Sequence, residues 1–208
     1  MHTFSVSAAD PDSAILAEAV AILQRGGVIA VATDTLYGLA ADPRNDAAVA
    51  RLFAAKGRDE GVPLPLIAAD LDQARAIAAF GETELRLARE FWPGPLTIVA
   101  PARAGIARRA LAGGATIGIR VPNHAVARAL CRAMGSCLTA TSANVSGAPA
   151  PASAAEIDPT IASRIEAVLD SGPAPGGPPS TIVAASPDGV QLLRAGAIAW
   201  ERVLESVE

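Results

Sequence analysis

Three short polar segments of the sequence carry residue types that bind anions. Residues 33–38 follow the apolar run 28–32, and residues 139–147 pass from a strand-like start into Ser, Asn and Gly. Lys56-Gly57-Arg58 adds two cations at the end of a predicted helix. Ligands of open α/β sheets bind outside the carboxyl ends of strands, where such hydroxyls and amides would lie. Polar loops are often only turns, but two of them after strands, beside a cationic segment, favour a phosphate or carboxylate site.

The cationic residues are unevenly divided between their two types. Of the 17 residues that are Lys or Arg, sixteen are Arg and only Lys56 is Lys. An ammonium differs from a planar guanidinium in hydration and reach. On one interpretation, the lone lysine therefore marks a place where Arg would not serve. Chance survival on a solvated helix end is the alternative interpretation, and the residue counts alone leave both open.

The usual catalytic side chains are few. His2 lies at an end that we expect to be frayed, and His124 opens a predicted helix. GxSxG, HExxH and GxxxxGK[ST] motifs are absent, and Cys131 and Cys137 have neither CxxC spacing nor a nearby His cluster, which predicts buried thiols. Without a persuasive nucleophile–base pair, the sequence favours chemistry by positioning and charge neutralisation, as in phosphoryl or nucleotidyl transfer.

Length and composition limit the class of protein. The chain has 208 residues, of which 51% are hydrophobic and 18% charged, so it is able to bury a sizeable core. A formal net charge of −4 excludes the strongly basic DNA-binding class. Uncharged stretches are rich in Pro, Gly and Ser, and residues 1–5 lack the features of a signal peptide, so we expect a soluble, cytoplasmic protein.

Hydrophobic periodicity alternates between helix-like and strand-like segments, which predicts an α/β fold. Helices are expected over residues 13–25, 46–56, 70–79, 82–91 and 124–134. Strands are expected over residues 28–32, 64–68, 96–99, 117–121, 137–140, 168–169, 180–184 and 190–193. The Pro- and Gly-rich run 171–179 is interpreted as a long loop, because too little chain follows it to build a second core. We expect one domain over residues 1–208, with a core of about 12–200.

Seven segments in order resemble the threonylcarbamoyl-AMP synthase family, the YrdC-like domain. They are TDTLYGL at 33–39, KGR at 56–58 with PL at 63–64, FWPGPLT at 91–97, IRVP at 119–122, TSANVSG at 141–147, PSTIV at 179–183 and LRAGAI at 193–198. Each is weak alone, but the ordered set spans nearly the whole chain. The resemblance implies a single-domain fold with a twisted, mostly mixed β-sheet, flanking helices and a concave ligand cleft.

The resemblance also implies a nucleotidyltransferase, L-threonylcarbamoyladenylate synthase. This activity converts ATP, L-threonine and bicarbonate or CO2 into threonylcarbamoyl-AMP and pyrophosphate. The product supplies the threonylcarbamoyl group of the modified adenosine beside the anticodon of tRNA. Implied partners are a downstream threonylcarbamoyl transferase complex and tRNA, both indirect, with double-stranded RNA as a further candidate and no membrane. Mg²⁺ would accompany ATP, mostly on phosphate and water ligands.

Site roles follow from the same resemblance. The implied catalytic residues are Lys56, Arg58, Ser142 and Asn144. The implied ATP-binding residues are Lys56, Arg58, Thr116, Ala140, Ser142 and Arg194. The implied threonine-binding residues are Thr33, Thr35, Arg120 and Ser180. Three positions depart from the family pattern: Ala32 replaces a Pro, Val62 a polar residue, and Ile67 a His found in some members.

Two other functions remain open. A non-catalytic YrdC-like protein would bind double-stranded RNA or tRNA, although the acidic balance counts against it. A carbamoyl-adenylate enzyme would use the same fold with another acceptor. Threonine-dependent adenylate and pyrophosphate would separate the synthase from both.

Overall fold

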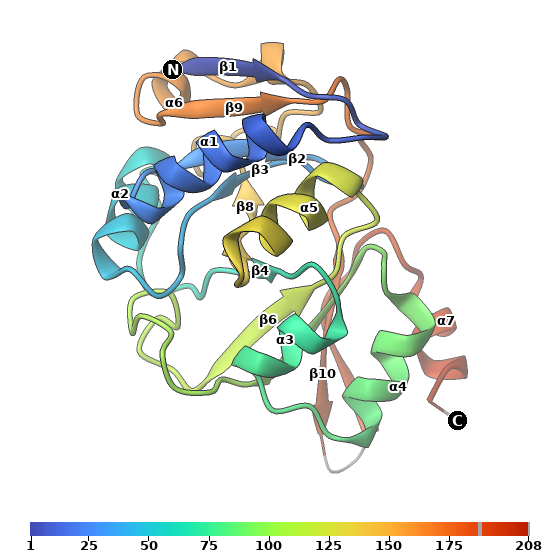
Figure 1. Cartoon of the computed structure of the whole chain (residues 1–208). Helices are drawn as coiled ribbons and strands as arrows, with labels where there is room; N and C mark the ends of the chain where they lie inside the picture. The colour runs from blue at the N-terminus through green and yellow to red at the C-terminus, as the bar shows by residue number, and fades with distance from the viewer. Residues whose placement is uncertain (187–188, 208) are drawn as a thin grey trace.

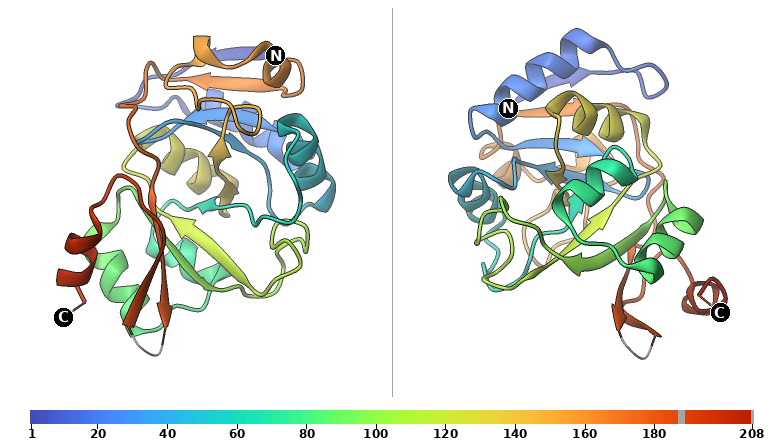
Figure 2. Two further views of the ribbon diagram at one scale, coloured as in Figure 1. Left: turned by 180° about the vertical axis from the view of Figure 1, so that it is seen from behind. Right: turned by 60° about the horizontal axis from the view of Figure 1, so that its bottom comes forward.

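A computed structural model describes residues 1–186 and 189–207. Its strands form two mixed sheets, stacked one above the other in Figure 1, with helices packed against both. Figure 2 shows the same arrangement from behind and from below. In the described part of the chain, no helix is long and apolar enough to cross a membrane.

The first sheet has the strand order β1-β9-β2-β3-β8. Its strands are β1 (His2–Ser5), β9 (Ala167–Asp170), β2 (Ile29–Ala32), β3 (Tyr37–Ala40) and β8 (Thr141–Ser142). Helices α1 (Ser13–Gln24) and α5 (Ala125–Met134) pack on one face, and α2 (Asp46–Lys56) and α6 (Pro159–Ala162) on the other. Because β2 is covered on both faces, all of its residues are buried, which accounts for its continuous apolar run.

The second sheet has the order β11-β10-β5-β6-β4-β7. Its strands are β11 (Gly189–Arg194), β10 (Thr181–Ser186), β5 (Leu96–Pro101), β6 (Thr116–Arg120), β4 (Leu66–Ile67) and β7 (Leu138–Thr139). Helices α3 (Leu71–Ile77), α4 (Glu82–Phe91) and α7 (Trp200–Glu205) contribute to the hydrophobic clusters on one face. Strand residues alternate between faces, so Leu96 and Ile98 join that core while Thr97 and Val99 face a cavity.

A β-bulge interrupts the pairing of β10 with β11. Ile182 lies opposite Arg194 and Val183 opposite Leu192, so Leu193 is the extra residue between them. Bulges re-aim side chains, and here both Leu193 and Arg194 line the cavity.

The helix ends are fixed by local caps. Asp12, Asp70 and His124 accept hydrogen bonds from backbone amides at the starts of α1, α3 and α5. Asn45 caps α2 in the same way, so the expectation that Asp46 is the cap is wrong by one residue, and Asp46 is instead the first residue of the helix. Gly57 ends α2 with a left-handed φ of 59°, which turns the chain between the two cations of the KGR segment.

The expected fold class is confirmed, with the strands divided between two sheets. Expected helices and strands agree with the structure to within a few residues, except that residues 64–68 form only the short strand β4. The expectation that His2 is frayed is wrong: its amide donates to the Glu166 carbonyl at 2.8 Å, and β1 pairs with β9. Strands β1, β3 and β8, the 3₁₀ turn Ala154–Glu156, and helices α6 and α7 lie outside the expected set.

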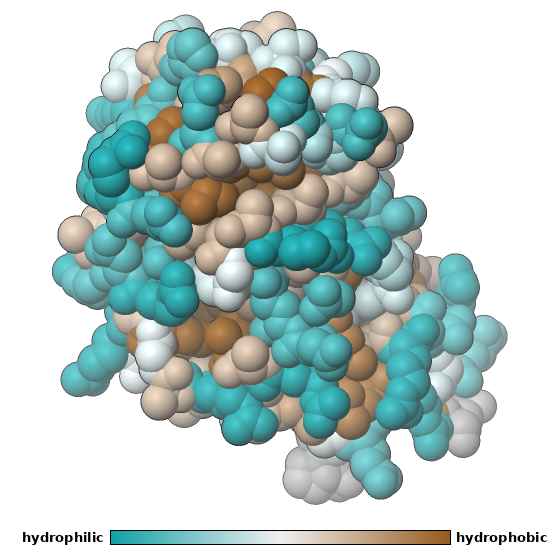
Figure 3. Space-filling view, in the orientation of Figure 1, coloured by the Kyte–Doolittle hydropathy of each residue, from teal (hydrophilic) through white to brown (hydrophobic). Residues whose placement is uncertain are grey.

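On the face seen in Figure 3, hydrophilic side chains cover much of the molecule, and hydrophobic surface shows mainly in seams between them.

Cys131 and Cys137 are buried, as expected, and burial raises the pKa of Cys137 to about 12. The one-domain expectation for residues 1–208 stays a prediction, and its last residue, Glu208, lies outside the described residues.

Candidate active site

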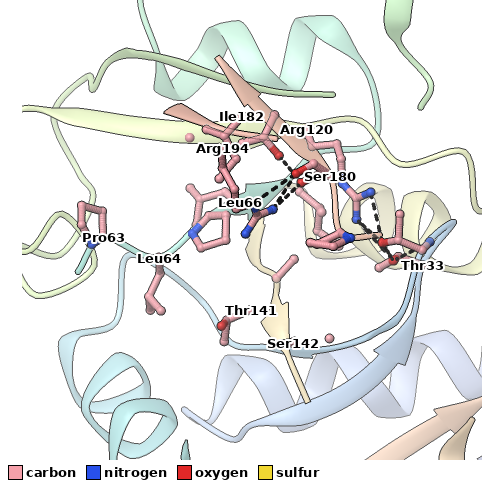
Figure 4. Close-up of a pocket in the computed structure, with 18 of the residues that line it drawn as sticks. Thr33, Pro63, Leu64, Leu66, Arg120, Thr141, Ser142, Ser180, Ile182 and Arg194 are labelled. Carbon is pink, nitrogen blue, oxygen red and sulfur yellow. Dashed lines mark hydrogen bonds between the residues drawn. The ribbon is translucent and has the colours of Figure 1, made fainter. Parts of the chain in front are cut away.

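A cavity of about 500 Å³ lies between the second sheet and one edge of the first. The second sheet lines it with β4, β5, β6, β10 and β11, and the rest of its lining includes β3, β8 and the segment 62–65. In the view of Figure 4, Arg120 and Thr33 lie at one end and Pro63 and Leu64 at the other, with Ser180 and Arg194 between them. The site therefore brings together segments that are far apart in the sequence.

Three arginines make the cavity electropositive. Arg58, Arg120 and Arg194 line it, and its described lining contains no Asp or Glu. Burial lowers the pKa of all three guanidinium groups, and the charges of Arg120 and Arg58 also lower that of Arg194. Several desolvated cations that repel one another are stabilised by an anion placed among them. The site is therefore suited to a multiply charged anionic ligand.

Arg120 is held at one end of the cavity by the turn after β2. Its Nη1 donates to Asp34 Oδ1 at 3.0 Å, and its Nη2 lies 3.3 Å from Thr33 Oγ1. The Thr33 hydroxyl donates to the Leu36 carbonyl at 2.7 Å and lies 3.1 Å from the Thr35 hydroxyl. These contacts fix a buried guanidinium, whose donors match a carboxylate, beside two hydroxyl oxygens.

Lys56 is buried behind the cavity and does not line it. Its Nζ donates to the carbonyls of Ser142 and Asn144, the latter at 2.7 Å, and lies 3.3 Å from Asn144 Oδ1. Burial, and to a lesser extent the charge of Arg58, lower the pKa of Lys56 to about 8. The compact ammonium thus ties the end of α2 to the 142–144 segment, a geometry that a planar guanidinium would not fit.

Arg58 reaches the cavity from the turn after α2. Its Nη1 donates to the Thr141 hydroxyl at 3.0 Å, and its Nη2 donates to the Pro63 carbonyl at 3.3 Å. Ala140 and Ser142, on either side of Thr141, also line the cavity. The KGR segment and the polar segment 139–147 therefore meet at this side of the cavity.

Ser180 joins two other groups on the cavity floor. Arg194 Nη2 donates to the Ser180 carbonyl at 2.7 Å and to the Ser180 hydroxyl at 3.1 Å. The Thr97 hydroxyl lies 2.8 Å from the same Ser180 oxygen. Thr97 was not singled out in the sequence, although a threonine alternating with apolar residues in a strand signals a polar group on the other face.

The structure brings most of the expected site residues together. The expected residues that line the cavity are Thr33, Thr35, Arg58, Arg120, Ala140, Ser142, Ser180 and Arg194. Asn144 stands with Lys56 behind it, and Thr116 is exposed at the start of β6, two residues from the lining residue Gly118. Val62 and Ile67, where the chain departs from the family pattern, give the cavity apolar lining.

Metal ligands are not gathered at this site. Within residues 1–186 and 189–207, no group of three or more His, Cys, Asp or Glu side chains is placed to hold a metal ion. Asp34 lies beside the cavity, but its Oδ1 is engaged by Arg120, and its Oδ2 is buried and has no hydrogen-bond partner among the described residues. The protein side chains described here therefore do not form a magnesium cage.

Residues 21–196 match the protein-family model Sua5/YciO/YrdC, whose description reads "Telomere recombination". The chain is 36% identical over 203 residues to a threonylcarbamoyl-AMP synthase of Bacillus subtilis, covering 97% of this chain and 58% of that protein. It is 39% identical over 163 residues to a threonylcarbamoyl-AMP synthase of Xanthomonas campestris, covering 77% of this chain and 87% of that protein. The chain thus spans little more than half of the first relative and most of the second.

Solved structures resemble most or nearly all of the chain. Sua5 of Pyrococcus abyssi, in a complex with L-threonine, superposes with a TM-score of 0.93 and 31% identity, over 99% of this chain and 61% of that one. YciO of Escherichia coli superposes with a TM-score of 0.86 and 26% identity, over 96% and 98% of the two chains. A HypF protein, at 18% identity and a TM-score of 0.73, shares the fold alone.

Proposed function

The chain belongs to the Sua5/YciO/YrdC family, and we propose that it makes threonylcarbamoyl-AMP from ATP, L-threonine and bicarbonate or CO2. One observation carries the proposal: a cavity rich in hydroxyls contains three arginines and no acidic side chain among its described lining residues. The reaction brings an anionic carbamate to an anionic triphosphate, so it needs fixed positive charge more than it needs a protein nucleophile.

The chemistry balances without a covalent enzyme intermediate. The neutral threonine amine adds to CO2 and releases a proton, or it displaces water from bicarbonate with no net release of a proton, and either route gives a carbamate. A carbamate oxygen then attacks the α-phosphorus of ATP, and the bond between that phosphorus and the bridging oxygen of pyrophosphate breaks. The side chains position the two reactants and neutralise the charge that develops on the phosphates.

The amino-acid end of the site is assigned to Arg120 and the hydroxyls around it. Arg120, nine-tenths buried and fixed by Asp34, would pair with the α-carboxylate of threonine. Thr33, Thr35 and Ser180 would offer hydroxyl partners to the amino acid. A polar partner for its β-hydroxyl would favour threonine over analogues that lack this group.

The nucleotide end is assigned to the other cations. Arg58, Ser142 and Arg194 would contact ATP directly, with backbone contact from Ala140 and an outer contact from Thr116. Lys56 and Asn144 would act from behind, by placing a buried positive charge and holding the carbonyls of the 142–144 segment. Mg²⁺ would arrive with ATP on phosphate and water ligands, and no step is assigned to it.

The proposed product is a mixed anhydride that must be passed on. Its acceptor would be a threonylcarbamoyl transferase complex acting on tRNA, and we propose a cytoplasmic location because that acceptor is there. Non-catalytic binding of double-stranded RNA or tRNA, and carbamoyl transfer to another acceptor, are outcomes that the test below can reveal.

Pyrophosphate release tests the proposal. The purified chain is supplied with ATP, L-threonine and bicarbonate, and each substrate is then omitted in turn. We expect release only when all three are present. Release that does not depend on threonine would point to another acceptor, and no release would remove the synthase function.

A further inference from the structure

The hydroxyls of Thr97 and Ser180 form a pair on the cavity floor. Thr97 is 2% exposed and Ser180 9% exposed, and their oxygens are 2.8 Å apart. Arg194 donates to the Ser180 oxygen from the other side, at 3.1 Å. Figure 4 shows the Arg194 side chain directed at Ser180 and Arg120 on the far side of it.

The rotamer of Thr97 is set by Gly118. A Cβ atom at Gly118 would lie 3.0 Å from the Thr97 methyl carbon, so the methyl group rests where glycine leaves room. Threonine is β-branched and stiff about χ1, so placing its methyl also places its hydroxyl. Gly118 on β6 therefore directs the Thr97 hydroxyl toward Ser180.

Counting protons shows what the pair offers to a ligand. Two hydroxyls carry two protons, and the bond between them uses one, whichever oxygen is the donor. Arg194 carries donors only, so it occupies an acceptor position on Ser180 and removes no proton. Within the described residues, neither hydroxyl has another acceptor, so one proton is left for the cavity that both residues line.

We propose that Thr97 is a positioning residue for the amino-acid substrate. It holds the Ser180 hydroxyl in one direction, and the pair donates its remaining proton to an oxygen of threonine. This inference rests on the proposed function, since it deepens the specificity of the same site. Gly118 acts through Thr97, and Thr97 acts through Ser180 rather than on the phosphorus that reacts.

Three variants of this pair make the inference testable. Thr97→Val keeps the shape and removes the hydroxyl, and we expect the KM for threonine to rise about fivefold to tenfold, as for the loss of one hydrogen bond. The KM for ATP and kcat should change less than twofold. Thr97→Ser keeps the hydroxyl and should recover most of the affinity for threonine. Gly118→Ala should raise the same KM, because the added methyl displaces the Thr97 side chain.

Thr181→Val is the matched control. Thr181 follows Ser180 in the chain and is fully buried, but its hydroxyl bonds the backbone of Ile198 on the helix side of the sheet. This variant should lower the thermal midpoint and leave the KM for threonine unchanged. It separates the loss of a buried hydroxyl from the loss of a substrate contact.

Steady-state kinetics and calorimetric titration with L-threonine give the two readouts. An unchanged KM and Kd for threonine in Thr97→Val, or equal changes in Thr97→Val and Thr181→Val, would overturn the inference. If Thr97→Val fails to fold, Gly118→Ala takes its place as the variant that displaces the Thr97 hydroxyl, and Thr97→Ser is the variant that keeps it. If the wild-type chain binds threonine and makes product, and Thr97→Val has the wild-type KM and Kd for threonine, only this inference is refuted. If the wild-type chain neither binds threonine nor makes product, the proposed function is refuted.

Discussion

Arg120→Met, made with and without Asp34→Asn, separates the structural role of the buried ion pair from its proposed role in binding. The two side chains are 8% and 10% exposed, and Arg120 Nη1 lies 3.0 Å from Asp34 Oδ1. Removing the guanidinium leaves a buried carboxylate whose other oxygen already lacks a partner. Breaking a buried pair in this way costs about 3–5 kcal/mol of unfolding free energy. At about 2–4 °C per kcal/mol for a chain of this size, the Tm of Arg120→Met should fall by about 6–20 °C.

The double variant should recover more than half of that stability. Replacing Asp34 by Asn removes the uncompensated charge, and a neutral side chain then faces another neutral side chain. Binding should not recover with stability, because neither variant has a cation for the α-carboxylate of threonine. Losing a hydrogen bond to a charged group costs about 1.5–3 kcal/mol, so the KM for threonine should rise about 10-fold to 100-fold in both.

Two assays give these quantities independently. Urea unfolding, extrapolated linearly to water, measures stability, and initial rates of pyrophosphate release over a range of threonine concentrations measure the KM. A loss below about 1 kcal/mol in Arg120→Met, or no recovery in the double variant, would refute the reasoning about the buried pair. A wild-type KM for threonine in the double variant would remove Arg120 from the amino-acid site.

Four further predictions concern the nucleotide end, the pH dependence of turnover and of stability, and substrate choice. Lys56→Ala and Arg58→Ala should lower turnover by about a hundredfold or more, while circular dichroism shows an intact fold. Lys56→Arg should also lower turnover, and near-normal rates in these variants would exclude the two residues from the active site. Because the pKa of Lys56 is lowered to about 8, wild-type turnover should fall as the pH rises through about 8. The residual activity of Lys56→Arg should not show this fall in its pH–rate profile. The lowered pKa also means that the charged form of Lys56 is disfavoured in the folded state. The contribution of Lys56 to the free energy of unfolding should therefore be lowest below pH 8 and should rise between about pH 8 and 10.5. Urea unfolding of the wild type and of Lys56→Ala across this pH range measures that contribution. In competition assays, threonine should be used well ahead of 2-aminobutyrate and valine, with serine rejected less strongly; equal rates for threonine and 2-aminobutyrate would show that the hydroxyl is not read.

Periodic segments of the sequence predicted their elements well. α4 begins at Glu82 and ends at Phe91 as expected, because one face of the helix is apolar and the residues before Pro93 end it. The apolar run at 28–32 predicted a strand covered on both faces, and β2 is fully buried. These elements are dictated by local patterns, which a single sequence displays.

Pairing between distant segments was not predictable in this way. β3 was interpreted as part of a polar loop, because Tyr37 and Gly38 follow two threonines and become strand residues only through pairing with β2 and β8. β1 depends on β9, a strand that lies more than 160 residues later in the chain. Local propensity carries no information about such partners.

The candidate site shows the same division. The polar loops and the KGR segment identified the wall of the cavity, because anion-binding residue types are visible in the sequence. That Lys56 lies behind the wall depends on where α2 ends, at Gly57, and on the carbonyls that surround the ammonium. The pairing of Thr97 with Ser180 joins two strands of the second sheet and became visible only in the structure.

Mass spectrometry of the product made with ¹³C-bicarbonate tests the central claim most directly. The proposed attack of a threonine carbamate on the α-phosphorus predicts an adenylate with the mass of threonylcarbamoyl-AMP, one mass unit heavier with the label, and one pyrophosphate per adenylate. An unlabelled threonyl-AMP, or ADP and phosphate in place of an adenylate and pyrophosphate, would contradict the proposed reaction.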